Sequence, residues 1–294
     1  MQEPSYPYGT ESHWQSSYPP VIETEPPRKT RKCLRIQIIL FLLTILSTAV
    51  VAGLEYSIAI ILILLFHEMG HYFTARHYGV RATLPFFIPF PLPPFGTFGA
   101  VIKMQSTIPN RKALFDIGIM GPAMGLVVAL PATIYGIAKS QVIQVGLLPQ
   151  QTTSLGDSLL FTFLAERIHG PLPEGYDILL HPIGFAGWAG LFVTALNLVP
   201  MGQLDGGHIV YALLKQRSVL MYQIVFAAFV IFSILGRHPH YVLFLAMVFF
   251  IIRLKHPPTL DDEQPIGTWR SVVGVLALLF FALIFTPVPI KFDF

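Results

Sequence analysis

Residues 56–78 read YSIAIILILLFHEMGHYFTARHY and combine a long apolar run with ionisable residues. An apolar run begins at Tyr56 and leads without a break into His67-Glu68-Met69-Gly70-His71. About 20 apolar residues allow a helix to cross the hydrocarbon core of a bilayer. Ionisable residues inside such a helix are costly unless they are paired or functional. The stretch therefore predicts a membrane-spanning helix with a functional site in its second half.

The spacing of the two histidines predicts a shared metal ion. Residues i and i+4 lie one above the other on a helix, so nitrogens of His67 and His71 can both reach one zinc ion at about 2.0–2.1 Å. Glu68 sits beside that face and can accept a proton from water without binding the metal. We therefore expect His67 and His71 as zinc ligands and Glu68 as the general base. The alternative is a pair of histidines that only form hydrogen bonds within a helix bundle.

A catalytic zinc ion needs a third protein ligand and an open position for water. Asp205 is the predicted ligand, because it is the only acid shortly after the later apolar span 182–200 and alternation of the spans returns it to the same side. Pro200 and Gly202 break the helix before it, and Gly206-Gly207 is expected to let the backbone bend beside the metal. A plain Asp-Gly-Gly turn at a helix end is the alternative.

The composition extends this prediction to most of the chain. The sequence is 53% hydrophobic and 12% charged, whereas soluble domains carry roughly 25% charged residues. Apolar spans are expected at 34–53, 56–78, 113–138, 182–200, 219–235, 240–252 and 272–286. A Pro- and Gly-rich stretch cannot continue a helix, and its later part, Phe95 to Met104, predicts a re-entrant β-hairpin near the active site. The expected fold is an all-α polytopic membrane protein of about six to seven spans with that small hairpin.

Two segments differ in character. Residues 1–32 hold six prolines, four glutamates and little that can be buried, so we expect a disordered cytoplasmic tail. Residues 33–294 form the predicted membrane-embedded metalloprotease domain. With the N-terminus in the cytoplasm, the opposite side holds only four of the 19 Lys and Arg residues, as the positive-inside rule requires. These four are Lys139, Arg167, Arg237 and Lys291.

Other classes of site and partner are excluded by composition. The single cysteine, Cys33, rules out an internal disulfide and a multi-thiolate metal site. The net charge of +3 is small and its basic residues are scattered, which is not the pattern of a nucleic-acid-binding protein. A metal in this chain must therefore be held by histidines and carboxylates.

Two motifs together resemble a known family. His67-Glu68-x-Gly70-His71 is followed on a later span by Asn197-x-x-Pro200-x-x-x-Leu204-Asp205-Gly206-Gly207. This combination resembles the site-2 protease family of intramembrane zinc metalloproteases, peptidase family M50. The resemblance implies zinc, peptide-bond hydrolysis within the membrane, metal ligands at the positions argued above, and a substrate-binding role for Asn197.

Further motifs resemble one branch of that family, which lacks a PDZ domain and occurs in bacteria and plastids. The plant gravitropism-deficient, yellow-green proteins typify this branch. These motifs are Pro109-Asn110-Arg111, Phe115-Asp116-Ile117-Gly118, Gly121-Pro122 and His256-Pro257-Pro258-Thr259-Leu260-Asp261-Asp262. Segment 139–180 is too short for an inserted PDZ domain. Substrate selection is then expected from the membrane domain, the tail or a separate partner.

The predicted function is hydrolysis of peptide bonds within or near transmembrane helices, in regulated intramembrane proteolysis. The expected partners are single-span membrane proteins and the lipid bilayer, with no nucleic acid, and the expected location is a bacterial inner membrane. A zinc transporter or a zinc-binding pseudoprotease is one alternative, although Glu68 argues against it because transport needs no base. A membrane zinc protease of another family is the second, although such enzymes use glutamate where this chain has Asp205.

Three further features carry open interpretations. The predicted hairpin offers a strand edge to an unwound substrate, or it is a loop that only covers the site. His208 is expected to hydrogen-bond near the metal rather than to bind it. Asp116 is expected to pair with Arg111 or Lys112 as a structural group.

Overall fold

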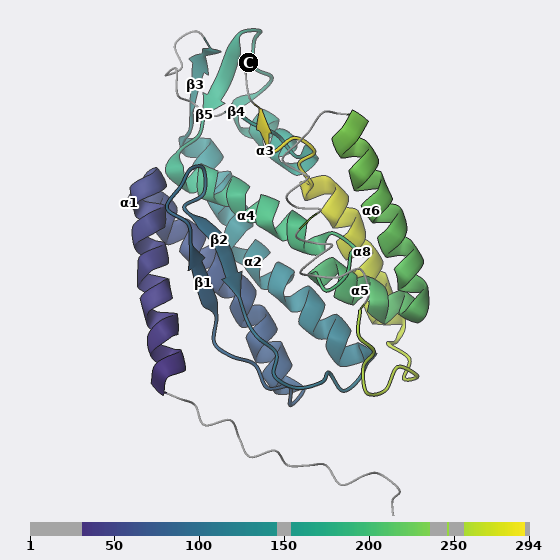
Figure 1. The fold of residues 1–294 in the computed structure, drawn as a ribbon. Coiled ribbons are helices and arrows are strands. Elements are labelled where there is room, and N and C mark those ends of the chain that lie inside the picture. Colours follow the sequence, from purple (N-terminus) through teal and green to yellow (C-terminus); the bar gives the residue numbers. More distant parts are fainter. Residues whose placement is uncertain (1–30, 146–153, 236–245, 247–255, 292–294) are drawn as a thin grey trace, which may run out of the picture.

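The computed structural model describes residues 31–145, 154–235, 246 and 256–291, and it is mostly helical (Figure 1). The helices are α1 (Arg31–His77), α2 (Arg111–Lys139), α3 (Leu159–His169), α4 (Pro182–Leu198), α5 (Asp205–Leu214), α6 (Ser218–Leu235) and α8 (Thr268–Ile284), with the 3-10 turn η2 (Lys215–Arg217) between α5 and α6. The strands are β1 (Phe86–Pro89), β2 (Thr97–Val101), β3 (Gln141–Gln144), β4 (Ser154–Leu155), β5 (Tyr176–Leu179) and β6 (Ile290–Lys291).

Helix α1 consists of two halves that meet at a kink. Ala52 and Gly53 have non-helical backbone angles, and Gly53 takes a φ of 85°, a conformation that favours glycine. Across the kink, the hydroxyl groups of Thr48 and Ser57 lie 2.7 Å apart and hydrogen-bond. The break falls at the turn that the sequence predicts between its first two spans. It separates a half that carries the His-Glu motif from a half that does not.

Helix α2 packs closely against the second half of α1 and against α4. The close approach depends on glycines, because an added Cβ at Gly136 would lie 2.1 Å from the backbone of Gly184. Likewise, a Cβ at Gly187 would lie 2.5 Å from the hydroxyl of Thr133. Small residues allow helix backbones to approach in this way within membranes. These three segments form the frame that positions the site.

Strands β1 and β2 form the antiparallel hairpin beside α1. Phe86 pairs with Val101 and Phe87 with Ala100, and a register shift follows before Pro89. The predicted hairpin is thus present, but its first strand begins earlier than the predicted start at Phe95. The reason is that the proline-rich segment forms the turn of the hairpin rather than a separate loop.

The two other small sheets were missed by the all-α expectation. Strands β3 and β5 pair antiparallel with Gln141 opposite Leu179, and β4 pairs antiparallel with β6. They lie with α3 at one end of the helices (Figure 1). Strands of two to four residues leave too short an alternation to be recognised in a sequence. The described residues of segment 139–180 therefore contain strands and a helix, where the sequence indicated only a polar segment.

Among the described residues, three helices are long and apolar enough to cross a membrane: Cys33–His77, Arg111–Lys139 and Asp205–Leu235. Helices Pro182–Leu198 and Thr268–Ile284 are apolar but shorter. The predicted span 240–252 lies outside the described residues, except for Ala246. Residues 1–30 of the predicted tail 1–32 also lie outside them. The total of about six to seven spans therefore stays a prediction.

Candidate metal centre

Three side chains from two distant segments converge on one point. The Nε2 atoms of His67 and His71 lie 3.2 Å apart. The carboxylate oxygens of Asp205 lie 3.2 Å from His67 Nε2 and 3.3 Å from His71 Nε2. Both histidines are buried, and these three residues form the group of potential metal ligands found within the described part of the chain. The structure thus brings together the three ligands that the sequence predicts.

The arrangement fits a zinc ion. Ligands at about 2.0–2.1 Å from a tetrahedral zinc ion lie roughly 3.3 Å from one another, close to the separations observed. His71 Nδ1 is 2.8 Å from the carbonyl of Ile117, so Nδ1 donates and Nε2 keeps its lone pair for a metal. Among the described atoms, Asp205 Oδ2 is buried without a hydrogen bond of good geometry, although His67 Nε2 lies near. A cation between these atoms would satisfy all three.

Glycines of α2 make room for the two imidazole rings. An added Cβ at Gly121 would lie 2.0 Å from His71 Nε2, and one at Gly125 would lie 3.1 Å from His67 Nδ1. The groups that these two glycines admit are the predicted ligands. Replacing either glycine would therefore disturb the site before it disturbed the helix.

The segment that carries Asp205 turns inward after α4 ends at Leu198. Gly202 takes a φ of 53° in this turn. Gly206 and Gly207 were expected to provide a bend, but they lie in the regular first turn of α5. Both glycines instead allow the backbone to pack closely. An added Cβ at Gly206 would lie 2.0 Å from the carbonyl oxygen of Leu198, and one at Gly207 would lie 2.3 Å from that of Gly202.

Glu68 is buried beside the histidines, at 6% exposure. Its carboxylate accepts a hydrogen bond from the backbone of Ile102, the residue that follows strand β2. The hairpin therefore touches the residue predicted to be the general base. This contact joins two features that the sequence suggested separately.

Asn197 lies on the last turn of α4, and its Nδ2 is 3.3 Å from His67 Nε2. It therefore borders the cluster of potential ligands, as the family resemblance implies. Its role in substrate binding stays a prediction.

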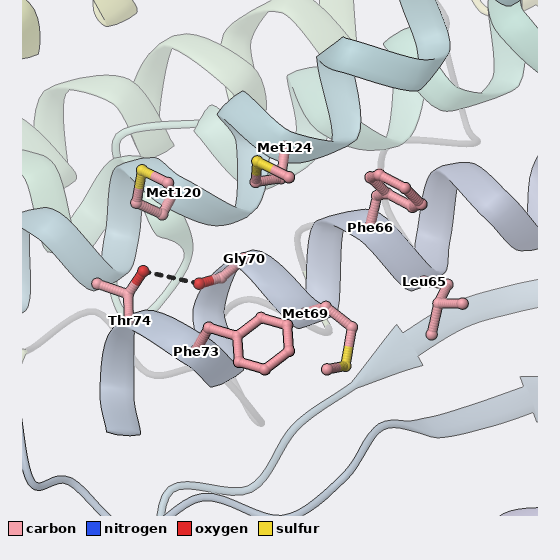
Figure 2. Close-up of a pocket in the computed structure, with 8 residues that line it drawn as sticks. All are labelled: Leu65, Phe66, Met69, Gly70, Phe73, Thr74, Met120 and Met124. Atoms are coloured by element: carbon pink, nitrogen blue, oxygen red, sulfur yellow. Dashed lines mark hydrogen bonds between the residues drawn. The ribbon is translucent and has the colours of Figure 1, made fainter. Parts of the chain in front are cut away.

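An apolar pocket of about 280 Å³ lies between α1 and α2 (Figure 2). Its walls come from α1 and α2: Leu65, Phe66, Met69, Gly70, Phe73, Thr74, Met120 and Met124. The hydroxyl of Thr74 donates to the carbonyl of Gly70 and is satisfied there. With about 3.6 residues per turn, Leu65, Met69 and Phe73 point away from the histidine face, whereas Thr74, three positions after His71, lies beside it. None of the three potential metal ligands lines this pocket.

Two further residues differ from or refine the expectations. Asp116 was expected to pair with Arg111 or Lys112, but it accepts hydrogen bonds from Arg270 at 2.8 Å and from Tyr78. Arg270 lies 154 positions away in sequence, so only the fold could reveal this partner. His208 does not join the cluster of potential ligands, and its Nδ1 lies 2.7 Å from His256 Nε2.

The sequence model of peptidase family M50 matches residues 55–235. The chain belongs to this family. The matched region includes the His-Glu motif, Asn197 and Asp205, so the residues that converge in the structure all lie within the family's part of the chain. The resemblance to the site-2 proteases is thereby confirmed.

Plant proteins of the same branch are among the relatives. The chain is 29% identical over 245 residues to "Probable zinc metalloprotease EGY1, chloroplastic" of Arabidopsis thaliana, covering 81% of this chain and 43% of that protein. Its rice counterpart (Oryza sativa subsp. japonica) is 29% identical over 243 residues, with 81% and 41% covered. "Probable zinc metalloprotease EGY2, chloroplastic" of Arabidopsis thaliana is 26% identical over 242 residues, with 82% and 43% covered. The chain thus spans less than half the length of each of these relatives.

Proposed function

We propose that this protein is an intramembrane zinc metalloprotease that hydrolyses peptide bonds within or near the transmembrane helices of other membrane proteins. The observation that carries the proposal is the convergence of His67, His71 and Asp205 beside the buried Glu68. Membership of a peptidase family and the names of the relatives support it. We assign the three converging side chains to zinc and Glu68 to proton transfer.

The residues of the site divide the chemistry between them. A zinc ion at His67, His71 and Asp205 would supply Lewis acidity and lower the pKa of a water molecule to roughly 7. Glu68 takes the proton from the attacking water and then delivers it to the leaving amine nitrogen. Asn197, whose Nδ2 lies 3.3 Å from His67 Nε2, would help to hold the substrate beside the histidines.

The hairpin presents the substrate in extended form. A helix hides its peptide groups in i to i−4 hydrogen bonds, so the segment to be cleaved must unwind. The edge of β2 can offer main-chain partners to such a segment, and the chain leaves that strand at Ile102, next to Glu68. A Gly or Pro in the substrate helix lowers the cost of unwinding by about 1–3 kcal/mol. We therefore propose single-span substrates with such residues close to the cytoplasmic side.

The alternatives explain the site less well. A zinc transporter or pseudoprotease needs no carboxylate beside the ligands, yet Glu68 is buried there and held by a backbone hydrogen bond. A zinc protease of another class would use glutamate as third ligand, whereas the carboxylate at ligand distance belongs to Asp205.

The proposed topology has the N-terminus and the 253–270 segment in the cytoplasm, residues 139–180 on the opposite side, and about six to seven spans. Labelling of Asp157→Cys in a Cys33→Ser background tests it. Labelling of that position only from the cytoplasmic side would invert the topology. The named relatives are chloroplastic, so they lend no support to a bacterial inner membrane, which stays a prediction.

The experiment that tests the proposed function is co-expression with candidate single-span proteins, comparing the intact enzyme with Glu68→Gln. The released fragments are identified by mass spectrometry. We expect fragments ending within the transmembrane segment with the intact enzyme only, because the amide of Gln cannot accept the proton of water. Equal fragment yields with Glu68→Gln would contradict the assignment of the general base.

A further inference from the structure

The first turn of α5 carries both Asp205 and, three residues later, the buried His208. His208 is 7% exposed, and its side chain lies near those of Asp205 and His71. Its Cβ and the carbonyl of Asp205 both face Gly118 of α2, where an added Cβ would lie 2.9 Å and 3.3 Å from them. Any rotation of this turn would therefore move the Asp205 carboxylate and the His208 ring together.

His208 is held by a partner far away in sequence. Its Nδ1 lies 2.7 Å from Nε2 of His256, with the two rings edge to face at 86°. The His256 ring stacks on Tyr211 of the same helix, with centroids 4.5 Å apart. His256 thus contacts α5 on two successive turns, once through a hydrogen bond and once through a ring face.

The direction of the hydrogen bonds follows from a peptide carbonyl. His256 Nδ1 lies 2.5 Å from the carbonyl of Pro257, which can only accept, so this nitrogen carries the proton. Burial lowers the pKa of His256 and favours the neutral ring, whose Nε2 is then an acceptor. His208 must therefore donate from Nδ1, which leaves the lone pair on its Nε2. The chain of contacts selects one tautomer of His208.

The segment that bears His256 is itself fixed to the frame, and we name residues 256–264 the C-terminal clamp. Asp262 accepts hydrogen bonds from the hydroxyl of Tyr211 at 2.6 Å and from that of Thr259 at 2.7 Å. Although burial opposes it, these bonds lower the pKa of Asp262 and keep it ionised. The clamp therefore closes on α5 through a charged acceptor as well as through His256.

Arg111, at the start of α2, completes the attachment. This buried guanidinium donates to the carbonyls of Asp262 and Gln264 in the clamp, at 2.7 and 2.8 Å, and to that of Ala212 in α5, at 2.7 Å. One side chain thus joins α2, α5 and the clamp. These contacts account for the Pro109-Asn110-Arg111 and His256 to Asp262 motifs, for which the proposed proteolysis alone gives no role.

We propose that the C-terminal clamp positions the metal ligand Asp205, with His256 acting through His208 to fix the rotation of the first turn of α5. His256 and His208 are positioning residues: neither lies in the ligand cluster. Groups that orient metal ligands contribute about 10–100-fold to metal affinity. The C-terminal clamp then supports a zinc site whose ligands all lie before it in the sequence. The inference rests on the zinc site proposed above.

The test is zinc affinity, measured by competition with a chromogenic chelator on the purified full-length protein. His256→Phe keeps a ring on Tyr211 but removes the hydrogen bond, and we expect the Kd for zinc to rise about 10–100-fold. His256→Gln restores an acceptor for His208 and should return to within roughly threefold of wild type. His77→Phe, at an exposed histidine, is the matched control and should bind zinc as wild type does.

The outcomes separate this inference from the proposed function. Wild-type protein that binds no zinc would contradict the proposed zinc site itself. Equal zinc affinity in wild type and His256→Phe would contradict only the positioning role of the clamp. If His256→Phe loses zinc affinity and His256→Gln does not, the hydrogen bond is the cause. Equal losses of zinc affinity in both variants would overturn the role of the hydrogen bond.

A second measurement needs no variant and so does not depend on a substituted protein folding. Carbon-13 and nitrogen-15 shifts of labelled histidine in the wild-type protein identify the tautomer of each ring. We expect His208 to be protonated at Nδ1. Protonation at Nε2 instead would overturn the proposed chain of contacts.

Discussion

The two halves of α1 are both long apolar helices, yet they occupy different environments. In the first half, Leu42, Leu46 and Val50 are 58%, 61% and 74% exposed. In the second half, Tyr56 is fully buried and Leu64 is 4% exposed. Apolar content therefore predicts that each half crosses the membrane, but it does not tell that the second half carries the more deeply buried apolar face.

The partners of each half explain the difference. The second half packs against glycines, where Gly121 of α2 admits the His71 ring and Gly190 of α4 admits Ile63. The first half turns a polar stripe toward the hairpin, because Gln37 donates to the carbonyl of Leu84 and Ser47 to that of Gly96. One half builds the metal centre, and the other supports the hairpin.

The largest effect is expected where the second half meets α2. Gly121→Ala places a methyl group 2.0 Å from His71 Nε2, and the ring cannot retreat without breaking its hydrogen bond to Ile117. We expect zinc affinity to fall by more than about 100-fold, which exceeds the usual effect of losing a group that only orients a metal ligand. Gly125→Ala, whose methyl group would lie 3.1 Å from His67, should lose less zinc affinity. Val50→Ala in the first half should keep the zinc affinity of the wild type. Wild-type zinc affinity in Gly121→Ala would refute this account of the glycines.

The next effect concerns stability. Leu64→Ala removes a buried side chain and should lower the free energy of unfolding by about 2–5 kcal/mol. Leu46→Ala removes an exposed one and should change it by less than about 0.5 kcal/mol. Thermal unfolding in one detergent, with zinc held constant, measures both. Similar shifts in melting temperature for the two variants would show that the halves are equally buried.

The smallest effect is expected from the hairpin support. Gln37→Leu removes the hydrogen bond to Leu84, whose net worth is about 0.5–1.5 kcal/mol. We expect the KM for a cleaved substrate to rise about two- to tenfold, with kcat and zinc affinity unchanged. Leu43→Ala, at an exposed position of the same half, is the control. A fall in zinc affinity without a change in KM would mean that the first half supports the metal centre instead.

The sequence predicts the parts of this molecule that depend on local spacing. His67, Glu68 and His71 form their motif within five positions, and the break after Leu198 follows from Pro200 and Gly202. Asp205 could be predicted because few acids follow an apolar span. These local signals need no knowledge of tertiary contacts.

Long-range partners could not be predicted in the same way. Asp116 pairs with Arg270 rather than with a neighbour, and the ring of His208 is held by His256, 48 positions away. The short strands of segment 139–180 could not be predicted either, because four residues are too few to show the alternation of apolar and polar side chains. In each case the deciding contact lies between segments whose relative placement only the folded chain defines.

The most direct test of the central claim, that Asp205 completes a zinc site begun on α1, is zinc X-ray absorption on wild type and Asp205→Ala. For wild type we predict nitrogen and oxygen ligands at about 2.0–2.1 Å, with the signature of two imidazoles. For Asp205→Ala we predict loss of the zinc or of one oxygen ligand. A variant that keeps the same zinc content and the same spectrum as wild type would contradict the account.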